Sequence, residues 1–152
     1  ADHTGPYHSA ERVPNRPRGP QGSGMRLMLA GHGPRNIGLA VRFGDWWSAY
    51  ATSSSQPEAF DEMLAVVDRT REEQGRDPAS LGRSIGVAVV LPGGEPDFFA
   101  GNHPIVGSTE QIAETLLSFA ERGVTSIELM ADADARDAIP VLGEVVAMVQ
   151  QA

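Results

Sequence analysis

Residues 26–44 read RLMLAGHGPRNIGLAVRFG, and this stretch decides the fold. The apolar run Arg26 to Ala30 predicts a short strand, and the glycine-rich segment after it predicts a tight turn. Proline favours the first position of a helix, because its missing N–H would have no partner there. Pro34 therefore predicts the start of a helix, and Gly44 predicts its end.

Three further stretches repeat this order of a strand followed by a helix. The run SIGVAVVL at 84–91 is almost entirely apolar, as expected of a strand that is covered on both faces. Ser108 and Gln111 have the spacing of a capping box, so a helix begins there. The predicted strands cover residues 45–50, 84–91 and 125–130, and the predicted helices follow at 57–74, 108–122 and 136–152.

The alternation of strands and helices predicts an α/β fold with a parallel sheet and right-handed crossovers. Residues 25–152 provide 32 residues for each of the four βα units, and a (β/α)8 TIM barrel uses roughly 31. The size fits half of such a barrel, and it fits a small open sheet equally well. Residues 1–24 contain four of the 11 prolines and no apolar periodicity, so we expect an irregular Pro/Gly-rich lead-in before a half-barrel domain at 25–152.

Composition excludes several classes of function. The chain has 152 residues with 12 basic and 20 acidic side chains, which gives a net charge of −8. Its scattered arginines offer no basic face for nucleic acid. The chain has no cysteine, which excludes disulfides and thiolate chemistry and fits the cytoplasm. No apolar run is long enough to span a membrane, and the N-terminal residues do not have the pattern of a signal peptide.

The turn from Gly31 to Arg35 is the strongest candidate for a binding site. It lies at the carboxyl end of a predicted strand, where barrel enzymes place their chemistry. Glycines let backbone N–H groups approach a ligand, and the N-terminus of the following helix attracts anions. Arg35 adds a forked guanidinium that suits a phosphate. The alternative is a plain tight turn with a solvated Arg35.

Other candidates favour structural roles. The four histidines have no metal-ligand spacing, and Asp132, Asp134 and Asp137 are typical of a solvated acidic loop at a helix start, so we expect no metal. The adjacent Trp46 and Trp47 must point to opposite faces of their strand. Packing explains both better than stacking on a cofactor does.

The ordered set of motifs resembles the luciferase-like monooxygenases, a superfamily of flavin- or deazaflavin-dependent oxidoreductases. The similar segments are 30–35, 39–47, 75–78, 107–113 and 120–124, which read AGHGPR, LAVRFGDWW, GRDP, GSTEQIA and AERGV. Residues 7–21 resemble the connection that precedes this region in the family. The resemblance implies strands five to eight of a (β/α)8 barrel, without the first four βα units.

In that family, the loop after this strand and the end of the next strand hold the cofactor phosphate. The residues implied here are Gly31, His32, Gly33, Arg35, Tyr50 and Thr52. The implied cofactor is flavin mononucleotide (FMN) or a deazaflavin (coenzyme F420), which carries the redox chemistry while the protein orients it. Ser48 shares the face of Trp46 and is a further candidate to bind the phosphate. Family residues near the reacting ring come from the absent half, so no catalytic residue is assigned.

The resemblance implies the C-terminal part of an oxidoreductase, either a monooxygenase or a hydride-transfer enzyme, that acts on a small-molecule substrate. We expect a fragment of a longer protein that is inactive alone. The alternative is a chain that pairs with a separate N-terminal half or, as a homodimer, with a second copy. The loop 92–104, with Phe98 and Phe99, would then be a lid or a cover for the partner's helices. A non-catalytic βα domain that binds a phosphorylated ligand or a protein partner remains a second class of function.

Overall fold

The computed structural model describes residues 2–14, 19–22, 24–95 and 102–152. Phe98 and Phe99 of the expected lid lie outside these residues. The strands are β1 (His3–Thr4), β2 (Ser9–Ala10), β3 (Met28–Ala30), β4 (Trp46–Tyr50), β5 (Gly82–Val90), β6 (Ile105–Val106) and β7 (Ser126–Ala131). The helices are α1 (Pro34–Phe43), α2 (Asp61–Glu73), α3 (Thr109–Glu121) and α4 (Ala135–Gln151), with short 3-10 helices η1 (Pro57–Phe60) and η2 (Pro78–Ser80).

Strands β3, β4, β5 and β7 form one parallel sheet in that order. β4 and β7 occupy opposite edges of β5, because both pair with its segment Ser84–Gly86. β6 lies on the same edge as β4 and pairs with Val89 and Val90, beyond the point where β4 ends. Each of the four strands leads into a helix, so the predicted α/β architecture with four βα units is confirmed. The short strand β6 was not predicted.

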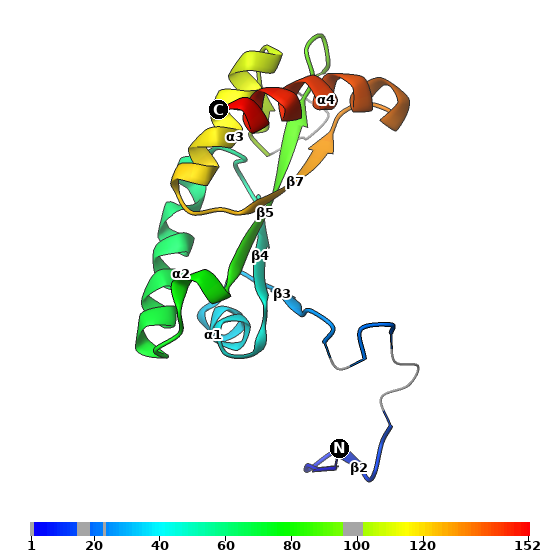
Figure 1. Cartoon of the computed structure of the whole chain (residues 1–152), viewed down its shortest axis with the longest axis vertical. Coiled ribbons are helices and arrows are strands. Elements are labelled where there is room, and N and C mark those ends of the chain that lie inside the picture. The colour runs from blue at the N-terminus through cyan, green and yellow to red at the C-terminus, as the bar shows by residue number, and fades with distance from the viewer. Residues whose placement is uncertain (1, 15–18, 23, 96–101) are drawn as a thin grey trace.

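One face of the sheet is covered by all four helices (Figure 1). Successive strand residues point to opposite faces, and those on the helix side form the core together with the apolar stripes of the helices. Trp47, Ile85 and Val87 are completely buried there. The helices contribute Ile37 and Val41 from α1, Leu64 and Val67 from α2, Ile112, Leu116 and Phe119 from α3, and Ala138 and Val145 from α4.

On the other, uncovered face of the sheet, the described part of the chain places no helix (Figure 1). Met28, Tyr50 and Met130 point to this side and are each about half exposed, at 51%, 59% and 48%. Trp46 also lies on this side, against Gly82, where any Cβ would collide with the indole ring. The two tryptophans thus face opposite sides, as predicted. In a complete (β/α)8 barrel, the side of the sheet without helices faces the interior.

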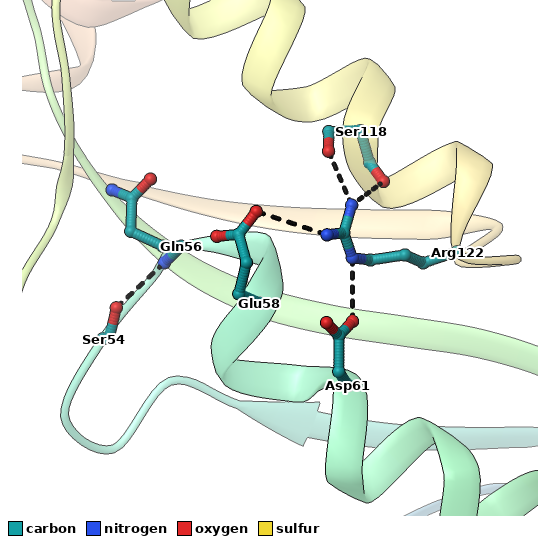
Figure 2. A network of polar contacts seen from close by, with 6 residues as sticks. All are labelled: Ser54, Gln56, Glu58, Asp61, Ser118 and Arg122. Atoms are coloured by element: carbon teal, nitrogen blue, oxygen red, sulfur yellow. Dashed lines mark hydrogen bonds and ion pairs between the residues drawn. The ribbon is translucent and has the colours of Figure 1, made fainter.

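Polar contacts join the C-terminus of α3 to the N-terminus of α2. Figure 2 shows the Arg122 guanidinium between the two helices. Its Nε donates to Asp61 Oδ1 at 2.8 Å, and an Nη contacts Glu58 Oε1 at 3.2 Å. The other Nη donates to the carbonyl and hydroxyl oxygens of Ser118, at 3.0 and 2.7 Å. These contacts link adjacent helices on the covered face.

The N-terminal segment runs away from the sheet in Figure 1. Its described residues include the two-residue strands β1 and β2, which pair antiparallel through His3 with Ala10 and Thr4 with Ser9. Tyr7 in the intervening turn is 88% exposed. None of these described residues belongs to the hydrophobic core.

Candidate functional site

The loop after β3 begins with a residue that must be glycine. Gly31 has φ of 152°, and a Cβ there would come within 2.6 Å of the Cβ of Asn36. Its N–H donates to the carbonyl of Ser48 at 3.0 Å. Its carbonyl accepts a hydrogen bond from the indole N–H of Trp47, also at 3.0 Å. Both contacts fix the start of the loop against β4.

His32 links this loop to the carboxyl end of β4. Its Nε2 accepts a long hydrogen bond of 3.4 Å from the backbone N–H of Tyr50. The two rings pack at a tilt with their centroids 4.8 Å apart. The imidazole of His32 and the backbone N–H of Tyr50 are therefore already partners of each other.

The N-terminus of α1 is open to a ligand. Gly33 occupies the N-cap position and so provides no side-chain oxygen, and Pro34 follows it. The N–H groups of Arg35 and Asn36 then have no partner within the helix. The first turn contains no acidic residue. Arg35 is exposed, and among the described residues it forms no ion pair.

Thr52 lies in the loop between β4 and η1, and this loop is held by a buried serine. The hydroxyl of Ser55, which is fully buried, accepts a hydrogen bond of 2.9 Å from the N–H of Ala88. This N–H lies beyond the end of β4, so Ser55 takes the place of a strand partner. Backbone contacts of His103 with Ser53 and Ser55 tie the loop to the segment before β6. Thr52 itself is exposed.

Of the six predicted residues, the structure brings Gly31, His32 and Tyr50 together. Within the described part of the chain, no hydrogen bond or ion pair joins Gly33, Arg35 or Thr52 to them. A cavity of about 300 Å³ adjoins the loop and is lined by His32, Pro34, Ala59, Glu62, Met63 and Val66.

A larger cavity lies at the opposite end of the sheet. It measures about 740 Å³ and is lined by residues at the amino ends of the strands, among them Arg26, Gly82 and Thr125. Chemistry in barrel enzymes resides at the carboxyl ends. The loops after β3 and β4, rather than this cavity, are therefore the candidate functional site.

Two polar residues on the uncovered face were not predicted. Ser84 donates its hydroxyl to Glu128 Oε1 at 3.1 Å, across β5 and β7. Sequence could have indicated them, because a lone glutamate at 128 interrupts the apolar strand TSIELM and Ser84 begins the run SIGVAVVL.

One acidic residue after β7, Asp132, binds backbone N–H groups. Asp132 accepts hydrogen bonds from the N–H groups of Leu91 and Glu95, at 2.9 and 3.1 Å. It thereby holds the segment that follows β5. Among the described residues, no group of three or more histidine or acidic side chains is arranged to bind a metal ion.

Comparison with known proteins identifies the family. A sequence model of the luciferase-like monooxygenases matches residues 1–94, which is more than half of the chain. The chain belongs to this family. No curated protein sequence matches this luciferase-like chain significantly.

Solved structures share the fold of this luciferase-like chain at low sequence identity. An F420-dependent secondary alcohol dehydrogenase, in complex with an F420–acetone adduct, has a TM-score of 0.71 and 16% identity over 98% of this chain and 56% of its own. The coenzyme F420-dependent tetrahydromethanopterin reductase from Methanopyrus kandleri has a TM-score of 0.74 and 14% identity over 96% and 57%. A riboflavin lyase with modified FMN and riboflavin has a TM-score of 0.74 and 15% identity over 99% and 48%. The chain thus spans about half the length of these proteins.

No helix in the described part of this luciferase-like chain is long and apolar enough to cross a membrane.

Proposed function

We propose that this chain forms the C-terminal half of the barrel of a luciferase-like oxidoreductase and holds the phosphate of FMN or coenzyme F420. The family match over residues 1–94 carries the proposal. The structural relatives, which include F420-dependent enzymes and a lyase with modified FMN, support this cofactor class. The proposed enzyme acts on a small-molecule substrate, and the half-barrel alone is inactive because family residues near the reacting ring come from the other half.

The residues after β3 fit a phosphate group. A Cβ at Gly33 would have no heavy atom within 4 Å, so a ligand can reach the backbone there. The uncapped N–H groups of Arg35 and Asn36 provide donors, and the helix dipole favours negative charge at the same place. The Arg35 guanidinium adds a charge-assisted bond. The absence of an acidic residue from the first turn of α1 removes a source of repulsion.

The other predicted residues have supporting roles. Gly31 fixes the loop against β4 through its contacts with Ser48 and Trp47. His32 and Tyr50 keep the two loops together. Thr52 supplies a hydroxyl from the neighbouring loop. A bound cofactor of this class supplies the redox chemistry, and the part of this chain is to orient its phosphate end.

A fluorescence titration of the chain with FMN and, separately, with coenzyme F420 tests the proposal. We expect saturable binding that Arg35→Ala weakens by roughly ten- to a hundredfold, because a hydrogen bond to a charged group contributes about 1.5–3 kcal/mol. Arg42→Ala is the matched control, since Arg42 is exposed in the last turn of the same helix.

Failure of a folded chain to bind either cofactor would contradict the proposal, as would equal losses in Arg35→Ala and Arg42→Ala. Binding of inorganic phosphate as tight as that of the cofactors would favour the non-catalytic phosphate-binding domain. The tighter of the two cofactors identifies the natural one.

We also propose that the chain completes its barrel with an N-terminal half or with a second copy. Two observations support this proposal. β3 and β7 each pair with one neighbour only among the described strands, and the uncovered face exposes Met28, Tyr50 and Met130. Unpaired strand edges and exposed apolar side chains are typical of surfaces that bind another segment.

A further inference from the structure

Among the described strand residues, one carboxylate, that of Glu128, points to the uncovered face of the sheet. Strand register places Tyr50, Gly86 and Glu128 in one row, because Gly86 pairs with Tyr50 on one side and with Glu128 on the other. This row lies at the carboxyl end of β4, next to the candidate phosphate site. The adjacent row toward the amino ends consists of Ser48, Ser84 and Ser126.

No described strand residue supplies a counter-charge for Glu128 on this face. Every other described strand residue that points away from the helices is apolar, glycine, serine or aromatic. The nearby Arg83 lies on the helix side, where it pairs with Asp68. Glu128 is exposed in this chain, and closure of the barrel over this face would enclose it. An enclosed carboxylate is costly unless it is paired and hydrogen-bonded. In a closed barrel, Glu128 therefore needs a partner from outside this sheet.

One oxygen of the carboxylate is held and the other is free. The fully buried Ser84 donates its hydroxyl to Oε1 at 3.1 Å. Among the described residues no other hydrogen bond reaches the carboxylate, so Oε2 can accept one. Because residue 86 is glycine, no side chain stands between Tyr50 and Glu128 in their row.

We propose that Glu128 is a specificity-determining residue that accepts a hydrogen bond from a cationic amine of the substrate. The inference rests on the proposed function, which brings cofactor and substrate to the carboxyl ends of these strands. Ser84 supplies one neutral donor and orients the carboxylate. A protonated amine supplies the missing counter-charge, whereas an anionic substrate is repelled.

Methyl NMR of the full chain, labelled at methionine and mixed with FMN or coenzyme F420, tests this inference. The probes are butylammonium and butyrate, which have similar size and opposite charge. Met130 lies two residues beyond Glu128 on the same face and reports binding, while Met148 on α4 packs against the core and serves as the reference. We expect butylammonium to shift the Met130 methyl and to bind roughly two- to fivefold more tightly than butyrate, because an exposed ion pair contributes about 0.2–1 kcal/mol.

Glu128→Gln keeps the shape of the side chain and removes its charge, so we expect this variant to lose the preference for butylammonium. Glu144→Gln, on an exposed position of α4, should retain it. The Met148 resonance verifies that each variant is folded.

Cofactor binding in the same samples separates this inference from the proposed function. If the chain binds a cofactor, but Glu128→Gln prefers butylammonium as strongly as the wild type does, the role of Glu128 is overturned. The proposed function is not contradicted by that result. A chain that binds neither cofactor, yet loses its preference in Glu128→Gln, contradicts the proposed function and supports the amine site. Absence of any preference in the wild type overturns the inference.

Discussion

At the scale of single residues, the loop after β3 depends on Gly31. Its φ of 152° lies in a region that side chains with a Cβ rarely adopt, and the side chain of Asn36 fills the space where a Cβ would point. Gly33, two residues later, has φ of −82° and open space around it. Glycine therefore suits the two positions for different physical reasons. The backbone conformation requires it at position 31, whereas at position 33 it keeps the approach to α1 open.

We expect Gly31→Ala to lower the free energy of unfolding by about 1–3 kcal/mol, the usual range for local backbone strain. Gly33→Ala is the matched control and should cost less than about 1 kcal/mol, because alanine adopts its φ without strain. Urea unfolding monitored by tryptophan fluorescence measures both. Equal losses in the two variants would show that the loop relaxes around a Cβ at position 31.

At the scale of elements, α3 begins with the predicted capping box. The Ser108 hydroxyl accepts a hydrogen bond from the N–H of Gln111 at 3.4 Å, and Gln111 Oε1 accepts one from the N–H of Ser108 at 2.9 Å. The same hydroxyl donates to Glu110 Oε2 at 2.6 Å. This hydrogen bond from Ser108 lowers the pKa of the Glu110 carboxyl.

Ser108→Ala should lower the free energy of unfolding by about 1 kcal/mol at neutral pH. A carboxyl with a lowered pKa in the folded state stabilises the fold above its unfolded-state pKa, and this contribution is lost as the pH falls through the folded-state pKa. The difference between wild type and Ser108→Ala should therefore narrow in acid. Urea unfolding at several pH values measures it, with Ser53→Ala in an exposed loop position as the control. A difference that widens in acid would contradict this role of Ser108.

At the scale of the whole molecule, the proposed closure of the barrel requires the free edge of β3. The backbone N–H of Trp46 donates to the carbonyl of Leu27, and the backbone N–H of Gly31 donates to the carbonyl of Ser48. Alternate residues along β3 therefore direct their backbone groups toward β4. The backbone groups of Met28 and Ala30 consequently face the free edge. An added strand would pair with them.

We expect sedimentation equilibrium to give twice the mass of one chain for a homodimer, or the mass of a mixed complex when a separate N-terminal half is supplied. Met28→Pro removes one N–H from the free edge without disturbing the pairing of β3 with β4, and should abolish the association. Met28→Ala removes the side chain but keeps the N–H, and should weaken the association less. A monomer at all concentrations, with or without the N-terminal half, would contradict closure of the barrel.

The order of strands and helices was readable from the sequence because it depends on local chemistry. Apolar runs such as 84–91, helix-starting prolines such as Pro34 and Pro57, and glycines after the helices act within a few residues of themselves. Family membership was also readable, because the similar segments occur in order along the chain. β6 was not predicted, since its two residues become a strand only by pairing with Val89 and Val90.

The sequence by itself determined the four βα units, the capping box at Ser108 and the opposite orientation of the two tryptophans, each of which follows from backbone geometry over short distances. Only the tertiary structure decided which side chains meet. Strand register put His32 against Tyr50 and brought Ser84 to Glu128, although 44 residues separate the latter pair. Register depends on contacts among all strands at once, and therefore no single stretch of the sequence reveals it.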